Sequence, residues 1–388
     1  MGGHLAYGFK DERIKYQVDG SYKISLLPRV VVSTRWSEEV EQMGFVNFAV
    51  DGRGLLNSVA MRVPLRKLNY FTERYGAVSV DFFRGGYGTF SLRTYEFNPA
   101  FPFYYIADEG LRSSYSTTEV GFSLRLSFRE EYVMRHGERI YTGSKYPVLY
   151  GSVDVGRAGL LGGEFDYVKA SASITDKLKL GRVGWANYTA TVGKVFGTVP
   201  YASLHVFRGN QSYATDPSGN YVDALLSYLG DRNRTAAFDR VSFNLMYFYE
   251  FVADEYFEAG FDHHFEGWIF NKLPLLRRPL HWLKWKEVVS FRMAAGRISA
   301  ANSRMNSPLL DPRFATQPEI AANAAELIPV RTPEQQPYYE VGVGVENIFR
   351  FLRVDFIWRL NYLNPVAPAE LQDFNYNFGV RFNIFLQF

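Results

Sequence analysis

The feature that most constrains this chain is the alternation of apolar residues with residues of other kinds over positions 374–388, which is broken only at Phe385. Every second side chain there is apolar: Phe374, Tyr376, Phe378, Val380, Phe382, Ile384, Leu386 and Phe388. A period of two is the signature of a β-strand. Strands of soluble proteins are usually about 5–6 residues long. The length therefore favours a tilted strand that crosses a membrane and extends into water at its ends.

The same alternation recurs upstream, at 120–128, 257–265, 339–345 and 352–362. The positions between the apolar residues carry many charges and glycines. The core of a soluble sandwich tolerates few such charges, whereas the interior of a wide barrel can hydrate or pair them. Because every backbone group in lipid must be paired, many strands of this kind imply a closed barrel.

The pattern predicts strands at 3–11, 13–25, 28–37, 70–84, 88–98, 116–132, 146–156, 163–176, 181–195, 201–209, 239–252, 254–266, 285–298, 337–347, 351–363 and 373–388. We therefore expect an all-β fold, a transmembrane antiparallel β-barrel of about 16 strands in a bacterial outer membrane. Residues 1–388 would form this one domain.

Other classes of protein are disfavoured by composition. No stretch approaches the roughly 20 apolar residues of a membrane-spanning helix. The absence of Cys excludes disulfides and zinc–thiolate sites, and the net charge of +3 is too small to suggest nucleic acid. The start, Met1-Gly2-Gly3-His4, lacks the features of a signal peptide. Either a leader was removed or, as we favour, this is the C-terminal domain of a longer protein.

Sidedness follows from the strand count. With both termini in the periplasm, the long connections 38–69, 99–115 and 299–336 lie outside the cell. By the same parity, 210–238 would be a long periplasmic connection, which is unusual for such barrels.

The last strand also carries a spaced motif. Asn377, Gly379, Phe382 and Ile384, with the terminal Phe388, resemble the signal that is read by the machinery that assembles outer-membrane barrels. An ordinary amphipathic strand is the alternative. If the barrel closes, this strand forms a seam with the first strand, which presents Leu5, Tyr7 and Phe9.

The segment 271–286 is basic, aromatic and interrupted by Pro. Such a segment between two strands is expected at the membrane interface, where Trp enters the bilayer and cations meet lipid phosphates. The alternatives are generic anchoring and specific recognition of a lipid or partner. Its interface residues are Arg277, Arg278, Trp282, Lys284, Trp285 and Lys286.

Charged residues in the polar phase of the strands are predicted to face the lumen. They could line a permeation path, but an ion-pair lattice that stiffens the wall is the favoured interpretation. The set is Arg125, Arg129, Glu258, Asp262, His264, Glu266, Arg292, Arg353, Asp355, Arg359 and Arg381.

We expect no enzyme, no cofactor and no metal site. His263 and His264 are adjacent, and adjacent strand residues point to opposite faces, so the pair cannot chelate one metal ion. A lipid-facing His beside a Ser would suggest an outer-membrane phospholipase, but no Ser is convincingly placed. Nucleophile, zinc-protease and phosphate-loop motifs are also missing.

The chain carries short motifs at 145–149, 193–201, 243–246, 249–251, 263–267, 271–276, 342–349 and 353–355. These motifs resemble a family of Bacteroidota outer-membrane proteins in which a carboxypeptidase-regulatory-like domain precedes a barrel of unknown function. That barrel is distantly similar to the BamA/TamA-type barrels, so the resemblance implies sixteen strands. The hallmark of those barrels is a Val/Ile-Arg-Gly-aromatic motif in a loop folded into the lumen, and that motif is not found in this chain. The nearest string is Phe83-Arg84-Gly85-Gly86-Tyr87, which predicts a tight turn.

The resemblance implies a role in envelope biogenesis in a Gram-negative bacterium: assembly, translocation or docking of outer-membrane or surface proteins, possibly as a subunit of a complex. The expected partners are outer-membrane lipid, lipopolysaccharide and proteins of that complex. The second hypothesis is a channel or transporter with a charged lumen. The third is a barrel enzyme of the phospholipase type.

Overall fold

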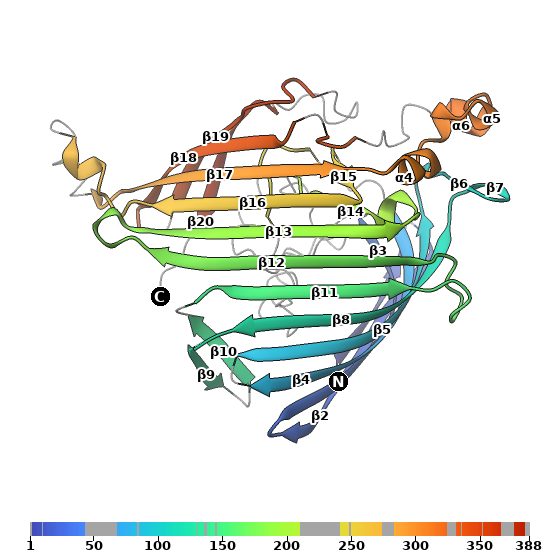
Figure 1. Ribbon diagram of the computed structural model, residues 1–388, viewed down its shortest axis with the longest axis horizontal. Helices are drawn as coiled ribbons and strands as arrows, with labels where there is room; N and C mark the ends of the chain where they lie inside the picture. The colour runs from blue at the N-terminus through green and yellow to red at the C-terminus, as the bar shows by residue number, and fades with distance from the viewer. Residues whose placement is uncertain are drawn as a thin grey trace.

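The chain is described by a computed structural model that covers residues 2–9, 11–42, 68–83, 85–129, 131–135, 138–143, 146–209, 241–247, 250–273, 283–323, 331–334, 336–350, 352–365 and 376–384. Within these ranges, fourteen strands form one strongly curved antiparallel sheet (Figure 1). The prediction of an all-β antiparallel architecture is confirmed.

The strands of the large sheet follow one another along the chain. Their bounds are β1 Gly2–Gly8, β2 Arg13–Leu26, β3 Arg29–Gln42, β4 Leu68–Phe83, β5 Gly86–Pro99, β8 Tyr115–Ser127, β11 Val148–Gly156, β12 Tyr167–Lys179, β13 Trp185–Gly197, β16 Glu255–His264, β17 Lys286–Arg297, β18 Tyr338–Ile348, β19 Leu352–Arg359 and β20 Phe378–Ile384. Within the described ranges β1 and β20 are the two edges of this sheet.

The remaining elements are small and lie in the connections. Three two-stranded sheets pair β6 Tyr105–Ala107 with β7 Gly110–Arg112, β9 Glu131–Arg135 with β10 Glu138–Gly143, and β14 His205–Val206 with β15 Val252–Ala253. The helices are η2 Gly181–Val183, η3 Tyr201–Ser203, η5 Phe270–Lys272, α4 Ala300–Met305, η6 Pro308–Leu310, α5 Pro312–Ala315 and α6 Pro318–Ala322. None of the described helices is long and apolar enough to span a membrane.

The two faces of the sheet have opposite polarity, and the polarity is inverted relative to a water-soluble protein. On the outer face, Phe291, Val343 and Phe356 are exposed. On the inner face, Arg292 and Glu340 are buried and lie directly opposite each other on β17 and β18. Since side chains alternate along each strand, one register produces both faces.

The two ends of the sheet also differ. At one end, which we call the turn end, neighbouring strands are joined mostly by short turns, such as Leu27-Pro28 and 349–351. At the other end, the loop end, lie the connections 100–114, 157–166, 198–254 and 298–337. Figure 1 shows β6, β7 and α4–α6 together at the loop end, opposite β9 and β10 at the turn end.

Two of the sixteen predicted strands were wrong. Residues 201–209 and 239–252 contribute only η3, β14 and β15 in the described ranges, and they do not join the large sheet. Their apolar residues are buried in both phases, as neighbouring Leu245 and Met246 show. These residues therefore belong to a segment that is buried inside the curved sheet and is not one of its strands. With these strands removed, the connection from β13 to β16 begins and ends at the loop end, which corrects the predicted sidedness of that connection. Residues 210–238 themselves lie outside the described ranges.

Candidate functional site: a segment held against the inner face

The most unusual feature of the fold is the connection between β13 and β16, which folds back against the inner face. Its described parts, 198–209, 241–247 and 250–254, are here called the inward segment. Phe207, Phe243, Met246 and Phe251 are buried in one cluster with Tyr338 of β18. Apolar burial of this extent stabilises the docked position by removing large side chains from water.

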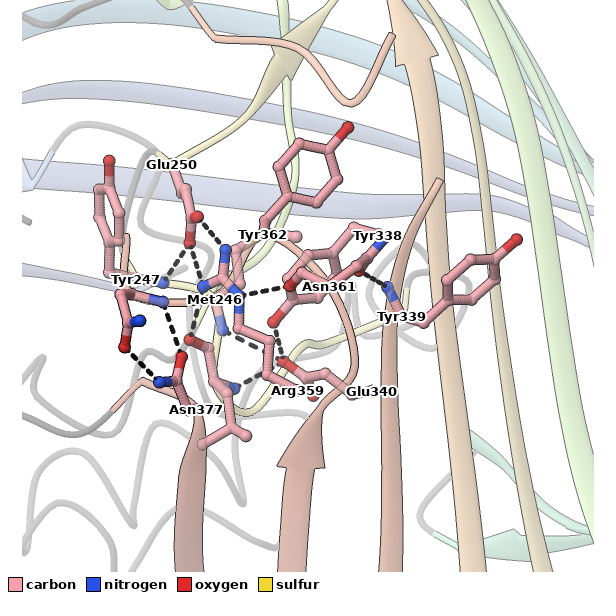
Figure 2. Close-up of polar contacts among 12 residues, drawn as sticks. Met246, Tyr247, Glu250, Tyr338, Tyr339, Glu340, Arg359, Asn361, Tyr362 and Asn377 are labelled. Atoms are coloured by element: carbon pink, nitrogen blue, oxygen red, sulfur yellow. Dashed lines mark hydrogen bonds and ion pairs between the residues drawn. The ribbon is translucent and has the colours of Figure 1, made fainter. Parts of the chain in front are cut away.

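Glu340 of β18 is the principal acceptor for the inward segment (Figure 2). Its carboxylate accepts the backbone N–H groups of Asn244 at 2.7 Å, Leu245 at 2.6 Å and Met246 at 3.1 Å. The hydroxyl of Tyr338 donates to the same carboxylate at 2.6 Å. Hydrogen bonds to an ionised acceptor are stronger than neutral ones, so a single buried side chain satisfies three donors of a segment that has no strand neighbour there.

A buried ion pair lies beside it. Arg359 of β19 donates from Nη1 to Oε2 of Glu250 at 3.0 Å and from Nη2 to Oε1, and both side chains are almost completely inaccessible. Glu250 also accepts the N–H of Tyr247 at 3.1 Å. Burial raises the pKa of the Glu250 carboxyl, and the Arg359 guanidinium opposes that rise. Burial, followed by the charge of Glu250, raises the pKa of Tyr247 to about 12.

The last strand also contacts the inward segment. Arg381 of β20 donates to the carbonyl of Asn244 at 3.1 Å. A Cβ atom at Gly379 would lie 2.9 Å from Cδ2 of Leu245, so the strand passes close to the segment at this glycine. Three consecutive strands, β18 to β20, therefore hold the segment with charged side chains and close packing.

The opposite flank of the segment meets β16. The ring of His205 stacks on Tyr256 with centroids 3.4 Å apart, and its Nε2 lies 3.5 Å from Oε2 of the fully buried Glu258. Glu258 also accepts the N–H of Val241 at 3.4 Å. Glu258 thus contacts both halves of the inward segment.

Two asparagines of the neighbouring connection hold the ends of the inward segment. Asn302 accepts the N–H of Val199 at 2.9 Å and donates to the carbonyl of Gly197 at 3.1 Å. Asn306 accepts the N–H of Tyr201 at 2.6 Å and donates to the carbonyl of Val199 at 3.0 Å. Asn302 also donates to Asp254, where the segment ends, at 2.9 Å. One helical turn therefore binds both ends of the segment.

Most of the predicted lumen charges lie on the inner face and are buried. Asp262 accepts from Arg292 at 2.6 Å, and Arg353 donates to Asp355 at 2.7 Å while lying 3.9 Å from Asp262. Arg381 is partly exposed. The buried members are Arg125, Glu258, Asp262, His264, Arg292, Arg353, Asp355 and Arg359.

Two of the predicted lumen charges are placed differently. Arg129 is exposed and follows the end of β8 with a φ of 52°, so the alternation of the strand does not reach it. Glu266 follows the end of β16 with a φ of 56° and binds Lys286 and the indole N–H of Trp185 at the turn end. In both cases a left-handed residue breaks the period of two.

The adjacent histidines diverge. His264 stacks on Trp185 with centroids 3.6 Å apart and bonds Glu346 through Nδ1 at 2.9 Å. His263 bonds the carbonyl of Val183 through Nε2 at 2.8 Å. In the part of the chain that the structure describes, no three metal-ligating side chains gather.

The predicted seam and interface residues are described only in part. Leu5, Tyr7 and Phe9 are exposed on or beside β1, while Asn377 bonds Asn364 at 2.6 Å. Phe382 and Ile384 lie in β20, but their side chains fall outside the described ranges, as does Phe388 entirely. Lys284 is exposed, Trp285 is half-buried and Lys286 binds Glu266. Arg277, Arg278 and Trp282 also lie outside the described residues.

Sequence reasoning did not single out the Arg-Gly string of the inward segment, Phe207-Arg208-Gly209. A Cβ atom at Gly209 would lie 2.5 Å from the carbonyl oxygen of Tyr247 and 2.9 Å from that of Met246, so only glycine fits. The string that the sequence predicts to be a tight turn lies at the junction of β4 and β5, with Gly85 at a φ of 94°. An Arg-Gly pair in the longest connection was the available signal.

Comparison with known proteins gives a family and a distant structural likeness. The crystal structure of BamA from Haemophilus ducreyi lacking POTRA domains 1–3 is similar at 7% identity and a TM-score of 0.46. That similarity covers 96% of this chain and 62% of that one. No curated protein matches the sequence. The family model described as "Family of unknown function (DUF5686) C-terminal domain" matches residues 87–229 and 230–296. Because the match covers more than half of the chain, the protein belongs to the DUF5686 C-terminal domain family.

Proposed function

We propose that this domain is a transmembrane β-barrel of the outer membrane of Gram-negative bacteria, Bacteroidota among them, and that it acts in envelope biogenesis. The observation that carries the proposal is the inverted polarity of the sheet: Phe291 and Val343 are exposed on one face, while Arg292 and Glu340 are buried on the other. A sheet of this kind is stable when lipid covers the outer face. Short turns at one end and long connections at the other are typical of such barrels.

The inward segment supports a role in assembly, translocation or docking of surface proteins, possibly within a complex. A segment held in the interior by a buried ion pair, Arg359–Glu250, and by the acceptor Glu340 occupies space that an open pore would leave to water. Phe207-Arg208-Gly209 lies in a connection folded inward, although the string departs from the Val/Ile-Arg-Gly-aromatic motif of BamA/TamA-type barrels at both flanking positions. In this role the protein is no enzyme: its working parts are the edges β1 and β20, which could template an incoming strand.

A channel is the second candidate, and one observation favours it. Across β3 to β12, Arg35, Glu73, Arg93, Glu119 and Lys169 form a row of ion pairs on the inner face. The cations of that row are 30–40% exposed, unlike the buried charges under the inward segment. Steady conductance of the purified protein in planar bilayers would favour the channel, and closed bilayers would favour biogenesis.

The membrane and biogenesis parts of the proposal are tested separately. Membrane fractionation of cells and protease treatment of the intact surface should find the protein in the outer membrane, with loop-end connections cleaved. Depletion of the protein should then reduce the amount of surface proteins on the same cells. If lipopolysaccharide or outer-membrane lipid is a partner, depletion should also lower the amount of surface lipopolysaccharide or the order of the lipid. Unchanged surface proteins after depletion would exclude the biogenesis role while leaving the barrel intact.

The edges can be tested by cysteine pairs because the chain has no Cys of its own. One cysteine is placed in β1, among Leu5, Tyr7 and their neighbours, and one in β20. A disulfide that joins the edges should abolish function in cells, and reduction should restore it. Full function with a quantitatively formed disulfide would rule out strand templating at the seam.

A further inference from the structure

The last strand of the large sheet is bound on one edge by another strand. β20 pairs with β19 from Trp358 opposite Phe378 to Leu352 opposite Ile384. Within the described ranges, its other edge pairs with no strand of the large sheet. A strand with one neighbour has half the ladder hydrogen bonds of an inner strand, so contacts from elsewhere have a large share in holding it.

Two adjacent residues of the inward segment tie three strands together on the inner face. The N–H of Asn244 donates to Glu340 of β18 at 2.7 Å, while its carbonyl accepts from Arg381 of β20 at 3.1 Å. The N–H of Leu245 donates to Glu340 at 2.6 Å, and its carbonyl accepts from Arg359 of β19 at 3.4 Å. The segment therefore links β20 to β18 across the intervening strand.

The same part of the segment also packs against the start of β20. The side chain of Leu245 lies over Gly379, where a Cβ atom would be 2.9 Å from its Cδ2. The ring of Tyr247 meets the buried ring of Tyr376, just ahead of β20, with centroids 5.7 Å apart. Together with the hydrogen bond from Arg381, these contacts place the segment along the first residues of the last strand.

The segment is built in a way that lets it move as a unit. Its backbone bonds to itself, from the N–H of Phe243 to the carbonyl of Arg208 at 2.8 Å and from the N–H of Phe207 to the carbonyl of Phe251 at 3.2 Å. The hydrogen bonds described above between the segment and β18, β19 or β20 all involve side chains of the strands. The segment can therefore leave without breaking the ladder that joins β18 to β19.

We propose that the inward segment is a latch for the last strand: docked, it holds β20 against β19, and undocked, it lets β20 separate, which exposes a new strand edge for pairing. The inference rests on the proposed templating at the edges of the sheet, and it adds what controls one of them. A strand edge pairs with an incoming strand only when its backbone groups are accessible. Because Glu340 anchors the segment from two strands away, loosening this anchor acts on β20 without touching it.

Hydrogen exchange of the whole domain in detergent micelles, followed by mass spectrometry, tests the latch. Glu340→Gln should accelerate exchange at residues 244–246 and also, on the order of tenfold, at the amides of β20. Arg381→Gln should accelerate β20 while residues 244–246 stay protected, because Glu340 still accepts their N–H groups. Asn302→Ala is the matched control: it loosens the start of the segment at Val199, and β20 should keep its native exchange rate.

Two results in the variants would overturn the latch. Native exchange of β20 in Glu340→Gln, with faster exchange at residues 244–246, would show that the segment and the last strand move independently. Equal acceleration in every strand, including the amides that pair β13 with β16, would show a general loss of stability instead of a local release.

A measurement on the native domain decides the point even if a variant fails to fold. As urea is raised, the amides of residues 244–246 and of β20 should open together, with one urea dependence, before those that pair β13 with β16. Separate opening of the segment and the strand would overturn the latch. These results concern the domain alone, so the latch can fail while the biogenesis role stands. Unchanged surface proteins after depletion would exclude that role and leave the coupling of segment and strand in place.

Discussion

Arg359 of β19 reaches across the interior of the sheet to Glu250 of the inward segment, and neither side chain is accessible to water. Arg359→Met should therefore leave a buried carboxylate without its partner, at a cost of about 3–5 kcal/mol in the free energy of docking. Limited proteolysis of the inward segment and urea unfolding would measure the loss. The double variant Arg359→Met with Glu250→Met should recover most of it, because no charge remains buried. Equal losses in the two variants would contradict this account.

The carboxylate of Glu340 accepts three consecutive backbone N–H groups, whereas Tyr338 adds only one hydroxyl to it. Glu340→Gln removes the negative charge and one acceptor, so we expect a loss of about 1–3 kcal/mol. Hydrogen exchange at Asn244, Leu245 and Met246 should accelerate accordingly. Tyr338→Phe is the control and should affect these amides much less. Similar protection in both variants would mean that the carboxylate is not the principal acceptor.

The side-chain amides of Asn302 and Asn306 replace the hydrogen bonds that a neighbouring strand would give to the start of the inward segment. Asn302→Ala leaves the N–H of Val199 buried without its acceptor, so we expect a cost of about 1–3 kcal/mol. Exchange of the Val199 amide should accelerate, while the amides that pair β13 with β16 stay protected. Asn323→Ala is the matched control, since that side chain only donates to the exposed carbonyl of Glu319. An unchanged exchange rate at the Val199 amide would show that Asn302 does not hold the start of the inward segment.

Two glycines near the inward segment should respond differently to the same substitution. A Cβ atom at Gly209 meets the backbone carbonyls of Tyr247 and Met246, whereas one at Gly379 meets only the flexible end of Leu245. Gly209→Ala should therefore cost about 1–3 kcal/mol, typical of overpacking, because backbone must move. Gly379→Ala should cost clearly less, because Leu245 can change rotamer. Thermal unfolding of the two variants side by side measures the difference, and the reverse order would refute the steric argument.

The sheet could be predicted from the sequence because its strands alternate, as Leu352 to Arg359 do with the single exception of Ile357. Alternation does not reveal whether a segment belongs to the sheet or packs against one of its faces. The prediction of strands at 201–209 and 239–252 is therefore wrong. Buried charge was predictable for Arg292 and Asp262 from phase alone. The partnership of Arg359 with Glu250 was not, because it joins residues from a strand and a non-strand segment with no shared period.

The left-handed residues Arg129 and Glu266 show the same limit on a smaller scale. Side chains alternate between the two faces only while the backbone is extended, and the alternation stops where one residue adopts a positive φ. Sequence gives no sign of that conformation at an Arg or a Glu, since Gly and Asn are the residues that usually adopt it. Both side chains were therefore assigned to a face that their backbones do not reach.

The described ranges contain fourteen strands of the large sheet, an even number, so the first residue of β1 and the last residue of β20 lie at the same end of the sheet. If the sheet spans a bilayer, a tag joined ahead of Gly2 and a tag joined after the last strand would be enclosed in one compartment. Antibodies against either tag would then leave intact cells unstained, while an epitope inserted between α5 and α6 would be labelled. An even number of described strands thus places the first residue of β1 and the last residue of β20 on the same side of the membrane.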